Sequence, residues 1–394
     1  MEFRMESMQS QIELFLHLIK HHLRPEHGAG ELPQTIEPEM VQKLMALAKM
    51  HDMTAIVGSA LIEQNMVSSP ELYKQIQKII CKEVALHEKM NYDLQWLRNV
   101  LEDGKIPFIP LKGSVVREYY PEPWLRSSCD IDILIRKEML DDTISYLVDK
   151  GCRIYCDEKQ HDVSLVTPGN VHLELHYRLL ESVDTVDTVL DEVWEHSCSV
   201  ADQEYEHRQS GAFLLFHLLA HMAYHLMYGG CGIRSIVDIW LLQKHMEYDP
   251  KELHQLCCEA KLERFYDNVQ KLIGVWFENK QHTTVTKQLE QVIVSGGTYG
   301  SQDNRILIDQ AQTGSKGKRL LKRIFMPYEG LKTQYPILIS HRWLTPVFQV
   351  VRWFRIFTGD RLRRAIREYK ASRSHSAEQV NEAKSFLKDV GLDF

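Results

Sequence analysis

Several patterns that would fix a function at once are missing from this sequence of 394 residues. No two of its eight cysteines have the Cys-x-x-Cys spacing of a zinc knuckle, and their positions suggest no disulfide framework. The chain also lacks a run of about 20 apolar residues, and its first residues do not follow the pattern of a signal peptide. We therefore expect a reduced, cytoplasmic protein without a transmembrane segment.

An excess of positive charge is absent as well. The chain has 47 Lys and Arg against 54 Asp and Glu, a formal net charge of -7, which argues against a protein that coats nucleic acid. Hydrophobic residues make up 44% and charged residues 26%, as in ordinary globular proteins. No internal repeat or low-complexity tract is present, and the length allows two or three domains.

The spacing of the apolar residues changes twice along the chain. Apolar residues recur every three or four positions before residue 103, which predicts helices, and Gly104 predicts the end of the last one. Short alternating runs then predict strands around one helix, and helical spacing returns after residue 183. We expect an α+β fold with a small mixed sheet between mainly helical regions. The expected regions are a helical one at 1–103, an α+β core at 104–182, a helical domain packing on the core at 183–310, and a basic, aromatic-rich helical end at 311–394.

Two carboxylates stand out in the predicted strand CDIDILI. Side chains alternate between the two faces of a strand, so Asp130 and Asp132 share one face. Like charges at this distance repel unless a cation lies between them, and such oxygen ligands suit Mg²⁺. A third acid, Glu174, stands between two leucines in another predicted strand. If the two strands pair, the three carboxylates converge on one metal site.

A second pattern lies just upstream, where Gly113 and Ser114 follow an apolar run. This order predicts a strand, a tight turn and the start of a helix. A glycine lets a phosphate approach the backbone, and Ser114 can cap the helix and donate a hydroxyl. Lys112 and Arg126 are candidates to hold the β- and γ-phosphates of a nucleotide.

These residues together resemble the DNA polymerase β-like nucleotidyltransferase superfamily, with its glycine-serine, paired-acid and third-acid signature. The segment LKGSVVREYYPEPWLRSSCDIDILI is similar, more narrowly, to a largely uncharacterised bacterial family within it. Members of that family also carry a Glu-x-His strand, here Glu174 and His176, and a later Arg-x-x-x-Asp, here Arg234 and Asp238. The resemblance covers roughly residues 40–290.

The resemblance implies a nucleotide site built from the residues named above. Asp130 and Asp132 would bind two Mg²⁺ ions, or Mn²⁺ in their place, and Gly113 and Ser114 would hold the triphosphate. Glu174 would complete the metal site or act as the base toward the acceptor hydroxyl, and this choice stays open. The implied activity is transfer of an NMP from an NTP, ATP among the candidates, to a hydroxyl-bearing acceptor with release of pyrophosphate.

Two other functions stay open at this point. The fold could bind nucleotide or a partner without turnover, or the enzyme could be a toxin-like nucleotidyltransferase that acts on tRNA. The acceptor is unknown in every case, because the helical regions that would form its pocket carry no readable motif.

Three histidines recur every fourth residue at His217, His221 and His225, so they share one face of a predicted helix. Without an HExxH arrangement they do not indicate a zinc protease, and histidines packed at an interface are the simpler interpretation. Arg234 and Asp238 lie one helical turn apart, which is typical of a surface ion pair. Because both match the family pattern, Arg234 is a second-rank candidate for substrate contact. His176 is a candidate to orient the carboxylate of Glu174.

The net charge of the chain hides a strong asymmetry. Residues 316–373 hold fifteen Lys and Arg against three acids, a local balance of +12 that leaves -19 for the rest. Aromatic residues are mixed with arginines in HRWLTPVFQVVRWFRIFTG, as in helices that lie on anionic membranes or grip RNA. Docking of this segment onto the acidic remainder of the chain, with its aromatics in the core, is the simpler interpretation.

Overall fold

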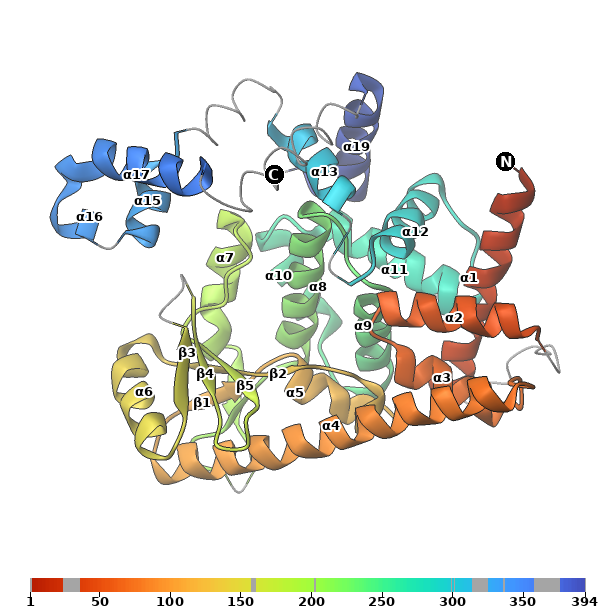
Figure 1. Cartoon of the computed structure of the whole chain (residues 1–394), viewed down its shortest axis with the longest axis horizontal. Helices are drawn as coiled ribbons and strands as arrows, with labels where there is room; N and C mark the ends of the chain where they lie inside the picture. The colour runs from red at the N-terminus through yellow and green to blue at the C-terminus, as the bar shows by residue number, and fades with distance from the viewer. Residues whose placement is uncertain are drawn as a thin grey trace.

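A computed structural model describes residues 2–23, 36–156, 161–201, 203–298, 300, 302–313, 325–335, 337–357 and 376–393. It shows the expected mixture of α and β structure, with one small mixed sheet enclosed by helices (Figure 1). None of the helices in these ranges is long and apolar enough to cross a membrane.

The long helix α4 (Pro70–Asp103) connects the two halves of the molecule. Its 34 residues span about 50 Å at the usual helical rise, and it runs beneath both the sheet and the helices α1 to α3 (Figure 1). The helix ends at Gly104, as predicted, but Gly104 keeps an ordinary helical φ of -77°. The glycine is needed for space instead, since a Cβ there would stand 2.6 Å from the ring of Tyr146. The helices before it are α1 (Glu2–Leu23), α2 (Pro38–Met50) and α3 (Thr54–Glu63).

The sheet contains the strands that the alternating patterns predicted, in the order β1-β2-β5-β4-β3. The central pair β2 and β5 is parallel, and the other neighbouring pairs are antiparallel. The helix expected between β2 and β3 is α6 (Leu140–Asp149), and the turn after β1 leads into the short helix α5 (Gly113–Val116). The strands are β1 (Phe108–Pro110), β2 (Asp130–Ile135), β3 (Arg153–Cys156), β4 (Asp162–Val166) and β5 (His172–His176).

The two faces of β2 look toward two different hydrophobic cores. Ile131, Ile133 and Ile135 pack with α6 and the second half of α4. Leu134, on the opposite face, belongs to the larger core of the helical body. Because side chains alternate along a strand, Asp130 and Asp132 share the face of Leu134. The carboxylates therefore point toward the helical body and away from α6 and the second half of α4.

The helical body consists of helices that precede the strands of the sheet in the sequence, α1 to α3, and of helices that follow them. Helix α19 packs beside α11, α12 and α13, so the C-terminal end of the chain returns to this body (Figure 1). A short hairpin of β6 and β7, which the sequence patterns did not predict, precedes α8. The elements are α7 (Asp184–Leu190), β6 (Ser197–Ser199), β7 (His207–Gln209), α8 (Gly211–Met227), α9 (Ile233–His245), α10 (Pro250–Glu259), α11 (Glu263–Glu278), α12 (Thr284–Gly296), α13 (Gln302–Thr313) and α19 (Ala377–Val390).

Three further helices form a separate small unit, which we call the C-terminal lobe (residues 325–335 and 337–357). It consists of α15 (Tyr328–Gln334), α16 (Ile337–Ser340) and α17 (Thr345–Phe357), and it projects from the body at the upper left of Figure 1. Leu331 and Leu338 are its buried apolar residues. Most of the basic residues of the segment 316–373 lie outside the described residues.

A buried histidine, His51, links three parts of the helical body. Its Nδ1 accepts a hydrogen bond from the backbone N–H of Ile233 at the start of α9 (3.1 Å), and its Nε2 lies 3.2 Å from the carbonyl oxygen of Val294 in α12. These two partners require a neutral ring with its proton on Nε2. Burial lowers the pKa of His51 to about 4, although the Val294 carbonyl and the charge of Asp52 act in the opposite direction.

The neutral state of His51 predicts a pH dependence of stability. Below its ordinary pKa of 6.5 the unfolded chain binds a proton that the folded protein takes up only near pH 4. The free energy of unfolding should therefore fall by about 3 kcal/mol between these two pH values. His51→Gln keeps a donor and an acceptor but does not titrate, so urea unfolding should show a shallower pH dependence than in the wild type. His245→Gln, at an exposed position on α9, is the control; identical pH profiles for wild type and His51→Gln would contradict the account.

Candidate active site

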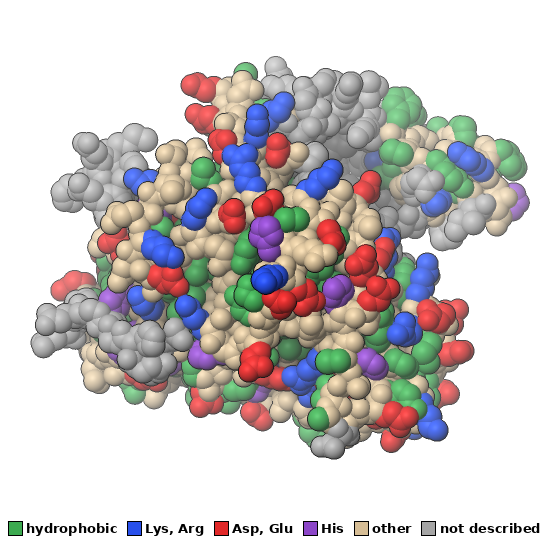
Figure 2. Space-filling view, turned by 180° about the vertical axis from the view of Figure 1, so that it is seen from behind, with side chains coloured by type: hydrophobic (Ala, Val, Ile, Leu, Met, Phe, Trp, Pro, Cys, Tyr) green, Lys and Arg blue, Asp and Glu red, His purple; other side chains and the backbone are tan. Residues whose placement is uncertain are grey.

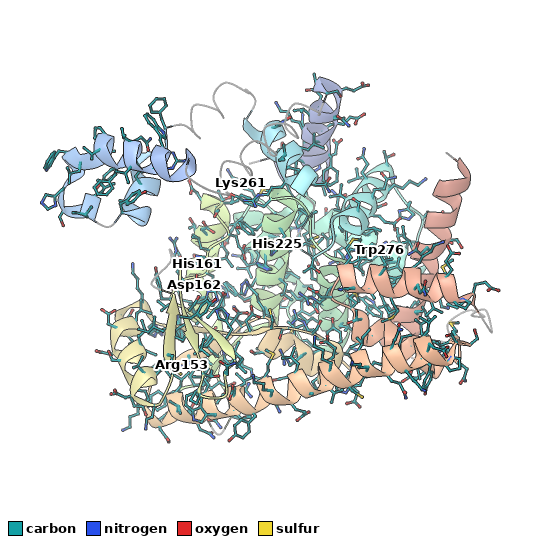
Figure 3. The ribbon with its side chains drawn as sticks, in the orientation of Figure 1. Arg153, His161, Asp162, His225, Lys261 and Trp276 are labelled. Atoms are coloured by element: carbon teal, nitrogen blue, oxygen red, sulfur yellow. The ribbon has the colours of Figure 1, made fainter. Side chains whose placement is uncertain are left out.

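The pairing of β2 with β5 brings two of the predicted carboxylates face to face. Asp132 is the direct partner of Glu174 in the parallel register, and Asp130 stands opposite His172. His176 lies two residues after Glu174, with its Nε2 3.1 Å from Oδ1 of Asp132 and 3.7 Å from Oε2 of Glu174. One ligand atom each from Asp132, Glu174 and His176 lie within 4.8 Å of one another. His161, which lies beside Asp162 just before β4 (Figure 3), stacks on the ring of His176.

The electrostatics of the pair Asp130 and Asp132 are asymmetric. Burial raises the pKa of the Asp130 carboxyl above its ordinary value, and the charge of Asp132 raises it further. Burial acts to raise the pKa of Asp132 too, but the hydrogen bond and charge of His176, together with Lys112, hold it well below its ordinary value. Perturbed carboxyls that border one cavity are typical of functional sites.

These side chains border a cavity of about 630 Å³ between the sheet and the helical body. Its walls come from the end of α2, the middle of α4, the segment 126–132, Glu174 of β5, α8 and α9. Of the residues predicted from the sequence as parts of the site, the ones that line the cavity are Lys112, Gly113, Arg126, Asp130, Asp132, Glu174 and Arg234.

The turn after β1 has the expected order of strand, turn and helix. Lys112 occupies the cap position of α5 with a φ of 30°, an unusual value for a residue with a side chain. Ser114 is therefore the second residue of the helix, and the prediction that it caps α5 is wrong. Its side chain is buried and is not part of the cavity wall, whereas Gly113 is.

Arg126 is held by a carboxylate of the helical body. Its Nε and Nη2 donate to Oδ1 and Oδ2 of Asp238 on α9 at 2.9 and 2.8 Å, and Tyr120 donates its hydroxyl to the same carboxylate at 2.6 Å. Both charged groups are buried. The surface pair expected between Arg234 and Asp238 is thus absent, because Asp238 points inward to Arg126. The remaining nitrogen of Arg126, Nη1, faces Gly113, where a Cβ would come within 3.2 Å of it.

Arg234 sits at the rim formed by α9 and the segment before β2. Its Nη1 donates to the carbonyl oxygen of Ser127 at 3.0 Å and lies 3.5 Å from Oδ2 of Asp52. This position at the cavity keeps Arg234 a candidate for substrate contact.

The histidines of α8 reach the cavity as a chain of contacts. His217 is fully buried, and its Nδ1 meets the amide of Gln209 at 3.2 Å. His221 Nδ1 lies 2.8 Å from Oε1 of Glu181 and 3.3 Å from Nζ of Lys112. His225 follows one turn later, with its Nε2 3.0 Å from Nε2 of His221 (Figure 3). Each of the three rings thus has a polar partner, in agreement with the packing interpretation, but His221 and His225 also line the cavity.

Two residues next to the site were missed by sequence reasoning. Glu181 is buried, which acts to raise its pKa, but the charges of His221 and Lys112 lower it to about 2. Arg117 is buried one turn after Gly113, donates to the Gly113 carbonyl at 2.6 Å, and contacts the hydroxyl of Ser128. Burial and the charge of Arg126 lower the pKa of Arg117 to about 10. An arginine four residues after the glycine was the only sequence signal for this contact.

The donor set fits a divalent metal ion. Asp130, Asp132 and Glu174 offer carboxylate oxygens, the ligands that Mg²⁺ and Mn²⁺ prefer, and His176 lies within hydrogen-bond distance of Asp132. Burial and then the charge of Asp132 raise the pKa of Asp130, and a bound cation would offset both effects.

A comparison with protein families assigns the chain to a family. A family model described as an uncharacterised nucleotidyltransferase matches residues 37–278, more than half of the chain. The chain belongs to this nucleotidyltransferase family. The matched range begins at Glu37, the residue before α2, and extends to the end of α11, so every cavity-lining residue named above lies inside it. The comparison with curated proteins found no match to this chain.

The buried pair of Arg126 and Asp238 should be essential for stability. Asp238→Asn would leave the guanidinium without its charged partner and should lower the free energy of unfolding by about 3 kcal/mol or more. The matched control is Asp191→Asn, because Arg178 and Asp191 form a similar two-pronged pair at the surface, where the loss should stay below about 1 kcal/mol. Equal losses in the two variants, measured by urea unfolding, would contradict this difference.

Proposed function

We propose that this protein is a divalent-metal-dependent nucleotidyltransferase that moves a nucleoside monophosphate from an NTP to a hydroxyl group of an acceptor. One observation supports the proposal above all: Asp132 faces Glu174 across the parallel strand pair, with Asp130 one strand repeat away in the same cavity. The family match to nucleotidyltransferases is consistent with this reading.

The proposed reaction is an in-line substitution at the α-phosphorus. A bond forms between the acceptor oxygen and this phosphorus, while the bond to the oxygen bridging the α- and β-phosphates breaks and pyrophosphate leaves. The acceptor hydroxyl transfers its proton to Glu174 or to water as the new bond forms. A divalent ion held by Asp130, Asp132 and Glu174 would supply the positive charge that stabilises the reacting phosphate oxygens.

Other residues of the chain would bind and orient the nucleotide. Lys112 places its ammonium group at the cavity between the carboxylates and His221, where it can neutralise phosphate charge. Gly113 leaves room for a phosphate beside Nη1 of Arg126, since a side chain there would collide with the guanidinium. His176 would hold Asp132 in position through their hydrogen bond, as ligand-orienting partners do.

Removal of a carboxylate should abolish transfer without unfolding the protein. We expect Asp132→Asn and Glu174→Gln each to reduce labelling by at least about a hundredfold. The assay incubates the protein with labelled ATP, CTP, GTP or UTP, Mg²⁺ and cell extract and follows label in macromolecules and small molecules. Asp141→Asn, an exposed change of the same charge on α6, should remain fully active. Labelling that is absent in the wild type, or equal in the three variants, would sink the proposal.

The nucleotide affinity should depend on Lys112. Lys112→Met removes the charge but keeps the apolar stem, so the Kd for NTP in the presence of Mg²⁺ should rise about tenfold, the loss expected for one charge-assisted contact. Calorimetry measures the change, with Lys82→Met at another lysine of the cavity wall as the comparison. If Lys82→Met raises the Kd and Lys112→Met does not, the triphosphate binds at the wall formed by α4 instead. Tight metal-dependent binding without any turnover would favour a binding module.

A further inference from the structure

The C-terminal lobe exposes a row of apolar side chains. Trp343 is 74% exposed, Val347 52%, Val350 43% and Val351 39%. The three valines are spaced by three and four residues on α17, so they share one side of this helix, and Trp343 lies in the short 3-10 helix Arg342–Leu344 that leads into it. We call these four residues the α17 stripe. Hydrophobic groups are visible on this lobe at the upper right of Figure 2.

The opposite side of α17 already has its partners within the lobe. Phe348 packs against Tyr335 with ring centroids 4.8 Å apart, and Trp353 meets Phe325 at 5.5 Å. Gln349 is buried between these aromatic contacts and donates to the carbonyl oxygen of Met326 at 3.2 Å. The α17 stripe is therefore surplus to the packing of the lobe. Its exposure also contradicts the prediction that the aromatic-rich segment docks onto the acidic part of the chain, as far as the described residues show.

The charge around the stripe is positive. Residues 325–357 contain four Lys and Arg and a single acid, and α17 itself has two arginines and neither Asp nor Glu. Arg342 is exposed next to Trp343, with its guanidinium 4.5 Å from the ring centre of Tyr328. The apolar stripe lies on a helix without acidic residues, within a segment of strong positive charge. These features are complementary to a surface whose outer layer is anionic and whose interior is apolar.

From this complementarity we infer that α17 lies in the headgroup region of an anionic lipid bilayer. Val347, Val350 and Val351 insert toward the acyl chains, Trp343 lies at the boundary, and the basic residues meet the lipid phosphates. With 13 residues the helix is about 20 Å long, too short to cross the hydrocarbon core, so it lies in the plane of the surface. The inference is independent of the proposed transferase activity.

The stripe favours lipid over RNA as the partner. RNA is gripped by aromatic platforms that stack on bases and by cations along the backbone. Three of the four stripe residues are valines, which have no face to stack and would bury well among acyl chains. RNA and a second copy of the chain are therefore outcomes of the test.

Flotation of the full-length protein with vesicles tests the inference. The wild type should float with vesicles of phosphatidylcholine mixed with phosphatidylglycerol, and should not float with phosphatidylcholine alone. Binding should weaken as salt rises, because the attraction between the lobe and the headgroups is screened.

Matched substitutions separate the stripe from a general effect of charge. Val351→Asp should weaken binding to the mixed vesicles by about tenfold, equivalent to about 1.4 kcal/mol, and Val347→Asp with Val351→Asp by more. The control is Val148→Asp on α6, which makes the same change at a valine of nearly equal exposure, 40%. Circular dichroism and thermal unfolding should show all variants folded, because these valines are on the surface.

A spectroscopic signature locates the contact. Mixed vesicles should shift the tryptophan emission of the wild type to the blue, and Trp343→Phe should still float but lose most of this shift. Wild type that stays in the unbound fraction, or Val351→Asp that floats like Val148→Asp, would overturn the inference. Two other results would overturn it as well. One is a protein that binds RNA but not vesicles, with the RNA binding weakened by Val351→Asp. The other is a dimer in solution that Val351→Asp dissociates.

Discussion

The parallel register of β2 and β5 is the constraint on which the candidate site depends. It sets Asp132 opposite Glu174 and turns Asp130 to the same face. A slip of one residue would rotate the carboxylates into the core with α4 and α6, and would expose the isoleucines to the cavity. The cost of burying unpaired carboxylates makes that alternative unfavourable. Hydrophobic packing on one face of the strand thereby fixes the chemistry on the other.

The rest of the cavity comes from helices far away in the sequence. Arg126 and Asp238 tie the segment before β2 to α9, and His51 ties the end of α2 to α9 and α12. These buried polar contacts hold together the elements that form the walls of the cavity. The C-terminal lobe is different, because its surplus surface faces outward. The molecule thus combines two different surfaces. The cavity is lined by carboxylates and basic side chains, which suit phosphate chemistry, and the C-terminal lobe exposes apolar residues in a basic segment, which suit contact with an anionic surface.

Local patterns were enough to predict the five strands of the sheet, the turn at Gly113 and the shared face of Asp130 and Asp132, because alternation and glycine chemistry are short-range signals. They were not enough for contacts made between distant elements. Spacing alone suggested that Asp238 pairs with Arg234, but in the tertiary structure Asp238 pairs with Arg126. Ser114 lies two positions after the cap, because the turn places Lys112 there with a positive φ. The link from Glu181 to His221 joins segments 40 residues apart, which no local pattern encodes.

The most direct test is a crystal structure of the full-length protein with Mn²⁺ and an NTP analogue that cannot be cleaved. Our account predicts anomalous density for Mn²⁺ among Asp130, Asp132 and Glu174, with the triphosphate beside Lys112 and Gly113. Mn²⁺ bound elsewhere, or a triphosphate at the far wall of the cavity away from these carboxylates, would contradict it.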